Sequence, residues 1–286
     1  MNDYLLSFIL GIVEGLTEFL PVSSTAHLRI SEALLGINLQ DGYWKMFSIV
    51  IQLGAILCLP IIFRRRISEF FLSFPKGVRG DRTLFTHPLT LTLLAFACTS
   101  VLALLSLKII GKHLESLFIM GTSFIVGGIV MWWVDDRYGT RPSGDVESIA
   151  FGQAIWIGIC QTLAPIFPGT SRSMATIAAG ELSGLSRTTS LEFSFLLSIP
   201  TMAAASGFDL FRTLHPSHSA EPAPPVHIDG HGWVLLGIGF VVSFFVAWGV
   251  VAWFLNWVRT RGFAPFAIYR IVLGIAVLVW AMKTAP

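Results

Sequence analysis

The sequence predicts an all-α polytopic membrane protein that contains two repeats of inverted topology. Of its 286 residues, 54% are hydrophobic and only 13% are charged, with a mean hydropathy of +0.73, whereas a soluble domain carries roughly 25% charged residues. Six apolar segments are long enough to cross a bilayer. Two further apolar segments are each interrupted by a proline and a run of hydroxyl residues, which predicts a pair of broken helices.

The two interrupted segments share one pattern at a constant offset of 147 positions (161 − 14). Without gaps, this offset pairs Gly11 with Gly158, Pro21 with Pro168, Ser24 with Ser171, and Thr25 with Arg172. The apolar skeleton is therefore duplicated while the polar residues differ. Paired broken helices in corresponding halves of a membrane protein point to a site within the membrane.

The elements of each repeat follow from the lengths of the apolar segments. In the first repeat, about residues 1–140, we predict a re-entrant helical hairpin at 4–36 and spans at 43–63, 88–111 and 117–134. In the second repeat, about residues 147–286, we predict a hairpin at 149–184 and spans at 189–210, 233–258 and 266–282. The hairpins are expected because Pro21 and Pro168 leave helical halves shorter than the ~20 residues of a span.

The loops set the orientation. Basic residues from Arg64 to Arg82 follow the first span, and the positive-inside rule explains them as a cytoplasmic loop without invoking nucleic acid. Asp135 and Asp136, at the end of the third span, are expected on a solvated loop face. The loop at 212–231 is rich in histidine but lacks convincing metal-ligand spacing.

Each half thus holds one hairpin that crosses no membrane and three spans. Because three is odd, the halves must be inverted relative to each other, within a single membrane domain of residues 1–286. The first hairpin is expected to open to the exterior and the second to the cytoplasm, with both tips near the midplane. Broken backbone at that depth is tolerated only where it is buried in protein or lines a cavity.

The first hairpin carries most of the reactive groups. Glu14 and Glu18 are four residues apart, so they share a helical face and could hold a divalent ion. Ser24 and His27 form a plausible pair of nucleophile and proton-transfer group. Ser23, Ser24 or Thr25 could cap the helix that follows Pro21.

The second hairpin supplies an anion cradle. A helix N-terminus and an arginine fork suit phosphate oxygens, and the residues concerned are Gly169, Thr170, Ser171, Arg172 and Ser173. Gln52, inside the first span, either faces this site or makes a simple interhelical hydrogen bond. Arg270, inside the last span, either pairs with a site carboxylate or extends towards the headgroups. Together these groups predict cleavage of a phosphate ester.

The chain resembles the undecaprenyl-diphosphate phosphatases of the bacitracin-resistance family. The resemblance covers essentially the whole chain and is carried by three motifs, at residues 14–28, 52–55 and 168–173. It implies removal of one phosphate from the C55 isoprenyl diphosphate, which yields the monophosphate carrier for peptidoglycan and cell-wall synthesis. It also implies a Mg²⁺ or Ca²⁺ requirement and an active site formed by Glu14, Glu18, Ser24, His27 and Arg172. Ala26 and Met174 stand where the family usually has glycine, which could narrow the pocket.

Several alternatives stay open at the level of sequence. The nucleophile is Ser24, His27 or a water molecule. The enzyme is expected in the bacterial inner membrane with its active site facing the exterior, acting on a polyprenyl diphosphate lipid, and a homodimer is left open. The rival function is a polyprenyl-phosphate transporter or flippase, because inverted repeats with broken helices are transporter architecture. A transporter has no need of a nucleophile.

Overall fold

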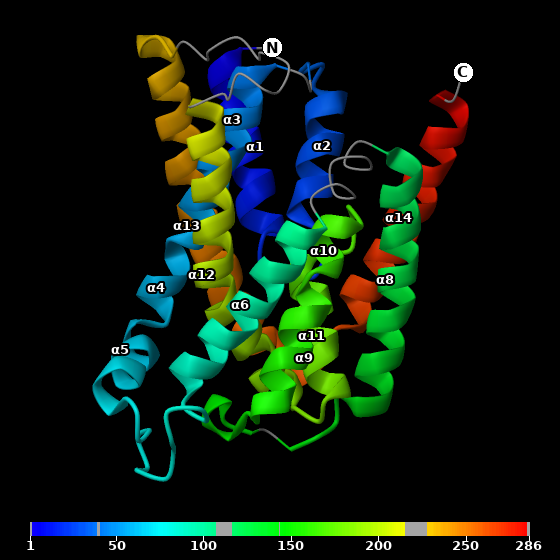
Figure 1. The fold of residues 1–286 in the computed structure, drawn as a ribbon. Coiled ribbons are helices and arrows are strands. Elements are labelled where there is room, and N and C mark those ends of the chain that lie inside the picture. The colour runs from blue at the N-terminus through cyan, green and yellow to red at the C-terminus, as the bar shows by residue number, and fades with distance from the viewer. Residues whose placement is uncertain (1, 39–40, 107–115, 143, 215–227, 285–286) are drawn as a thin grey trace. The chain divides into compact units, whose positions relative to one another are not determined.

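The computed structural model describes residues 2–38, 41–106, 116–142, 144–214 and 228–284. The described residues form helices joined by turns (Figure 1). Six of these helical stretches are long and apolar enough to cross a membrane, as predicted, and they are Gly42–Ile62, Pro88–Leu105, Leu117–Tyr138, Arg187–Phe211, Gly230–Arg261 and Ala264–Lys283. The predicted end of the second span at 107–111, its following connection, and His215, His218 and His227 lie outside the described residues.

The individual helices carry these bounds. In the first part of the chain they are α1 Asp3–Thr17, α2 Ser24–Leu34, α3 Gly42–Ile56, α4 Cys58–Ile62, α5 Arg64–Ser73, α6 Pro88–Leu105 and α8 Leu117–Tyr138. A 3-10 turn at Val146–Ser148 precedes α9 Phe151–Gln161, α10 Leu163–Ile166, α11 Arg172–Leu182, α12 Arg187–Leu214, α13 Gly230–Arg261 and α14 Ala264–Thr284. Both predicted broken helices are present, as α1 with α2 and as α9 with α10 and α11. Their re-entrant course stays a prediction.

The chain forms two compact units. Unit 1 comprises Met1–Phe19, Ser24–Ile62 and Ser198–Ala252, and unit 2 comprises Leu20–Ser23, Phe63–Leu197 and Trp253–Pro286. Each unit therefore takes helices from both halves of the predicted repeat, and α12 and α13 run from one unit into the other. The division into two repeats stays a prediction, and each unit is described by itself below.

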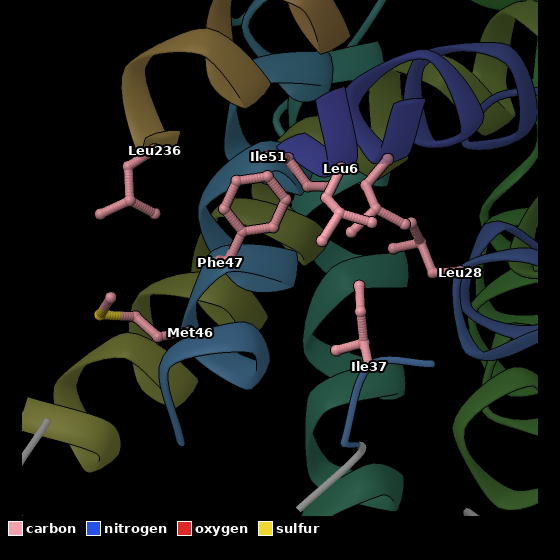
Figure 2. Packing of buried hydrophobic residues seen from close by; sticks show 8 residues of the cluster. Leu6, Leu28, Ile37, Met46, Phe47, Ile51 and Leu236 are labelled. Atoms are coloured by element: carbon pink, nitrogen blue, oxygen red, sulfur yellow. The ribbon is translucent and has the colours of Figure 1, made fainter. Parts of the chain in front are cut away.

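Unit 1 is built around an apolar cluster. Leu6 and Leu10 of α1 meet Phe47 and Ile51 of α3, all four at most 7% exposed, and Figure 2 shows Phe47 and Ile51 gathered beside Leu6. Glycine allows the helices to approach closely, since a Cβ at Gly11 would lie 2.8 Å from the carbonyl oxygen of a residue in α13. Residues of one helical face thus fix α1 against α3 and α13.

Unit 2 depends on two close helix pairs. Helices α8 and α14 lie side by side (Figure 1), and a Cβ at Gly274 would lie 2.8 Å from the Gly121 oxygen. Helix α6 packs on α9, where the Thr99 hydroxyl donates to the Gly158 oxygen at 2.7 Å. Small residues at such crossings bring backbones together, as is typical of helix packing in membranes.

The solvated role expected for Asp135 is wrong. Asp135 is only 4% exposed, and its carboxylate accepts hydrogen bonds from the Arg187 guanidinium and, at 2.8 Å, from the Phe263 amide. It therefore joins the end of α8 to the start of α12 and to the turn before α14. Its neighbour Asp136 is exposed, as expected. Two adjacent aspartates on a helix point about 100° apart, so one can be buried while the other meets water.

Candidate active site

The first break begins where α1 ends. The Glu18 backbone is still helical, with its N–H donating to the Glu14 oxygen, and Pro21 then prevents the helix from continuing. The chain turns through Ser23, whose φ of 71° is positive, and α2 starts at Ser24. A serine in this region of backbone space is uncommon and costs conformational energy.

The second break has the same backbone device. Ser171 has a φ of 68° and a ψ of 121°, and its side chain accepts a hydrogen bond from the Met174 amide at 3.4 Å, so it caps α11. Within the described residues, Ser23 and Ser171 are the two residues other than glycine with positive φ. Strained backbone of this kind clusters at functional sites, which supports both breaks as parts of a site.

The structure shifts the correspondence between the breaks by one residue. Helix α2 starts at Ser24 directly after Ser23, and α11 starts at Arg172 directly after Ser171, an offset of 148 (172 − 24). The gapless sequence alignment had paired Ser24 with Ser171. The residue of positive φ and the helix start that directly follows it instead pair Ser24 with Arg172. Ser24, predicted as a nucleophile, and Arg172, predicted to bind an anion, therefore occupy equivalent positions in the two breaks.

In unit 1, the central contact joins Ser24 to Glu18. The Ser24 hydroxyl donates to Glu18 Oε2 at 2.5 Å across the break, and the two residues are 7% and 6% exposed. A hydroxyl has one proton to donate, and Ser24 donates it to Glu18 rather than to His27. Sequence reasoning missed this pairing because the five residues between Glu18 and Ser24 are not helical.

The other candidates of unit 1 differ in exposure. Glu14 is fully buried one turn before Glu18, His27 is half-buried, and Thr25 is exposed. Gln52 accepts a hydrogen bond from the Ser206 hydroxyl of α12 at 3.1 Å. The interhelical bond, one of the two interpretations of Gln52, is therefore present, and its part in substrate binding stays a prediction.

Glu14 and Glu18 offer the oxygen donors that a hard divalent cation prefers. Among the described residues no group of three or more His, Cys, Asp or Glu side chains is arranged to hold a metal. Magnesium is commonly held by only one or two carboxylates together with substrate phosphates and water. The donor set therefore fits a cation that is completed by the substrate, rather than one caged by the protein.

In unit 2, the residues of the second break surround the start of α11. Thr170, Ser171 and Ser173 are at most 9% exposed, Arg172 is half-buried, and Gly169 has a φ of 94°. A Cβ at Gly169 would lie 2.7 Å from the Met120 backbone oxygen. Both the positive φ and this close approach therefore require glycine at this position. The predicted cradle residues are thus gathered at one helix N-terminus, where amide groups and the helix dipole favour anions.

Both expectations for Arg270 are wrong. Its side chain is completely buried, so it does not extend to the headgroups, and within the described residues no carboxylate lies within 4.0 Å of it. It donates instead to three backbone oxygens, those of Pro21 at 3.0 Å, Ser123 at 3.1 Å and Gly169 at 3.0 Å. Sequence patterns identify a buried charge but do not reveal carbonyl acceptors.

The six long apolar helices of the described residues indicate a multi-pass membrane protein, and both of its helix breaks carry buried polar residues. The chain belongs to the family described as bacitracin resistance protein BacA, whose model matches residues 7–276. This confirms the resemblance seen in the sequence.

Its relatives are similar over almost their full lengths. An undecaprenyl-diphosphatase of Koribacter versatilis (strain Ellin345) is 65% identical over 285 residues, covering 99% of this chain and 100% of the relative. Proteins of the same name from Polaromonas naphthalenivorans (strain CJ2) and Caldanaerobacter subterraneus subsp. tengcongensis are 39% and 38% identical, covering 96% and 95% of this chain and 93% and 94% of the relatives.

Proposed function

We infer that this chain is an undecaprenyl-diphosphatase. It hydrolyses undecaprenyl diphosphate to undecaprenyl phosphate and inorganic phosphate, which returns the lipid carrier to peptidoglycan synthesis and confers bacitracin resistance. The family match and the shared name of relatives up to 65% identical support this activity. The transporter alternative gains no support from them.

The observation that carries the chemistry is the hydrogen bond from Ser24 to Glu18. A hydroxyl beside a carboxylate has a base ready to accept its proton as it attacks. Attack by Ser24 Oγ forms a bond to the terminal phosphorus, the bond from phosphorus to the bridging oxygen breaks, and the proton passes to Glu18. Undecaprenyl phosphate leaves, and water then cleaves the phosphoserine, which releases phosphate and restores the hydroxyl.

Stabilisation of the negative charge on the phosphate oxygens is assigned to the second break. Arg172 is the first residue of α11. Its guanidinium therefore adds a fixed positive charge at the positive end of the helix dipole. Such donors act most strongly where they are preorganised before charge develops. His27, half-buried near the start of α2, is assigned proton transfer. Binding of the remaining phosphate oxygens is assigned to Ser23, Thr25, Gln52, Gly169, Thr170, Ser171 and Ser173.

A divalent cation, Mg²⁺ or Ca²⁺, would be held by Glu14 and Glu18 together with substrate oxygens. When bound, it neutralises the diphosphate and the charge that develops on it. Because Glu18 also accepts from Ser24, one carboxylate links the hydroxyl to the cation site. Titration of the protein with Mg²⁺ or Ca²⁺, monitored by thermal unfolding, should show stabilisation that is weakened in Glu14→Gln.

The orientation follows from the positions of the basic residues. Arg64 to Arg82 and the pair Arg259 and Arg261 are expected in the cytoplasm, which directs the first hairpin to the exterior of the inner membrane. Reporter fusions within the Arg64 to Arg82 loop test this, and an exterior reporter there would overturn the orientation. A homodimer is a further expectation, to be tested by the mass of the protein in detergent.

The activity is tested by phosphate release from C55 isoprenyl diphosphate in detergent, with and without divalent cation. Wild type should release phosphate, and Ser24→Ala should lose at least about 100-fold in kcat, because the nucleophile and its proton acceptor are separated. Ser31→Ala removes a hydroxyl two turns further along the same helix and serves as the matched control. Equal rates in Ser24→Ala and wild type would refute the assigned nucleophile, and no release by folded wild type would refute the function.

A further inference from the structure

Among the residues that the structure describes, Arg270 is the most deeply buried charged side chain that the proposed reaction does not use. It lies within the membrane span α14 and has no exposed surface. A charge within a membrane is costly and is retained chiefly where it has a function. The three carbonyl oxygens that it contacts belong to three different segments, namely the two breaks and helix α8.

Two of these acceptors are equivalent positions. Pro21 lies two residues before Ser23, the residue of positive φ in the first break, and Gly169 lies two residues before Ser171 in the second break. Arg270 Nη1 donates to the Pro21 oxygen and Nη2 to the Gly169 oxygen, both at 3.0 Å. One side chain therefore binds the same turn position in both breaks, and both turns belong to unit 2.

These oxygens need an external donor. A carbonyl in a helix break has no N–H of the next turn to bind, and in a membrane no bulk water replaces it. Within the described residues no backbone amide donates to the Pro21 or Gly169 oxygen. The planar guanidinium carries five N–H groups in a fixed geometry, so it can serve both oxygens at once, which a lysine cannot do with comparable precision.

The third acceptor shows how the guanidinium is placed. Nη2 of Arg270 also donates to the Ser123 oxygen of α8 at 3.1 Å, so the arginine is held against the helix that lies beside α14. The Phe124 ring lies 5.5 Å from the guanidinium carbon, which adds a cation–π contact. Gly127 leaves the necessary space, because a Cβ there would lie 2.2 Å from Nη2.

We propose that Arg270 is a positioning residue that holds the turns of both helix breaks through their backbone carbonyls. Pro21 leads through two residues to Ser24, and Gly169 leads through two residues to Arg172. The arginine does not itself touch the reacting atoms. Its effect on catalysis rests on the proposed phosphatase function, whereas its effect on the two breaks does not.

The first test needs no activity. Amide hydrogen exchange is measured by mass spectrometry on purified wild type, Arg270→Lys and Arg270→Met. Peptides covering Leu20–Ser23 and residues 169–171 should exchange at least tenfold faster in both variants, and should do so together, because one side chain binds both turns. Unchanged exchange in either break would overturn the proposal. Gly127→Ala should have the same effect, because the new Cβ clashes with Nη2 of Arg270. Gly121→Ala controls for altered packing, because its Cβ would meet the Leu278 side chain at 2.8 Å between the same two helices.

The second test separates positioning from general stability. Because a displacement of about 1 Å can cost roughly 100-fold in rate, Arg270→Lys should lose about 10- to 100-fold in kcat per folded molecule with KM changed less than about threefold. In an Arg172→Ala background the same change should cost less than it does in wild type, because one of the two groups whose backbone it holds is gone. Fully additive losses, or a normal kcat in a merely less stable protein, would overturn the positioning role. Absence of phosphate release by wild type would instead refute the proposed function, and the exchange test would still decide the role of Arg270 in the breaks.

Discussion

Asp135→Asn tests the buried junction of unit 2, by which we mean the contacts of the Asp135 carboxylate with Arg187 and with the Phe263 amide. Its neighbour Asp136 offers a matched control. The two residues are adjacent and equally charged, yet Asp135 is 4% exposed and Asp136 is exposed. Asn at position 135 removes the charge opposite Arg187 and weakens the bond to the Phe263 amide, which is 2.8 Å long in the native protein. The variant should therefore loosen the ends of α8 and α12 and the turn before α14.

The magnitude follows from burial. Breaking a buried ion pair costs about 3–5 kcal/mol, but the Arg187 side chain is 25% exposed and can regain some hydration. Asparagine also retains one oxygen acceptor. We therefore expect a loss of about 2–3 kcal/mol, which lowers the melting temperature by roughly 4–12 °C for a protein of this size.

The assay is thermal unfolding in detergent, followed by the fluorescence of the nine tryptophans at one fixed scan rate, because membrane proteins often unfold irreversibly. Asp136→Asn should change the melting temperature by less than about 2 °C, as is usual for an exposed charge. Adding Arg187→Gln to Asp135→Asn should cost less than the sum of the single changes. Equal melting temperatures for the two asparagine variants would refute the junction.

Three further predictions concern buried groups elsewhere. Burial raises the pKa of Glu181 to about 8, so the folded protein binds the carboxyl proton more tightly than the unfolded chain does. The stability gained from this proton is complete below about pH 4.5 and is lost as the pH rises to about 8. The melting temperature should therefore fall over this pH range in wild type and fall less in Glu181→Gln. Burial lowers the pKa of His87, so stability should fall as the pH drops below about 6.5, and His87→Gln should remove that acid-dependent loss. Gly54→Ala should prevent folding or lower the melting temperature by more than about 5 °C, because its Cβ would lie 2.6 Å from the Phe240 oxygen, whereas Gly237→Ala, with open space around it, should have little effect.

Much of the fold could be predicted from sequence because apolar length and helix breakers are local signals. The six spans and both breaks at Pro21 and Pro168 follow from them. Contacts across the breaks could not be predicted. Ser24 pairs with Glu18 through irregular backbone, and no periodicity describes such a turn.

Two other features were hidden for related reasons. The burial of Asp135 depends on the Phe263 amide, which lies far along the chain. The acceptors of Arg270 are backbone oxygens, which every residue carries and which therefore leave no mark in the sequence. The one-residue shift that pairs Ser24 with Arg172 likewise appears only once backbone angles and helix starts are known.

The central claim is that the carboxylate bound to Ser24 drives hydrolysis, and two buried glutamates of unit 1 test it most directly. Glu18 accepts from Ser24 at 2.5 Å, whereas Glu32, 2% exposed, accepts from Ser48 at 2.7 Å. The measurement is kcat for phosphate release from C55 isoprenyl diphosphate, per folded molecule, in Glu18→Gln and Glu32→Gln. We predict a loss of at least about 100-fold in Glu18→Gln and less than about threefold in Glu32→Gln. Equal rates in the two variants would contradict the claim.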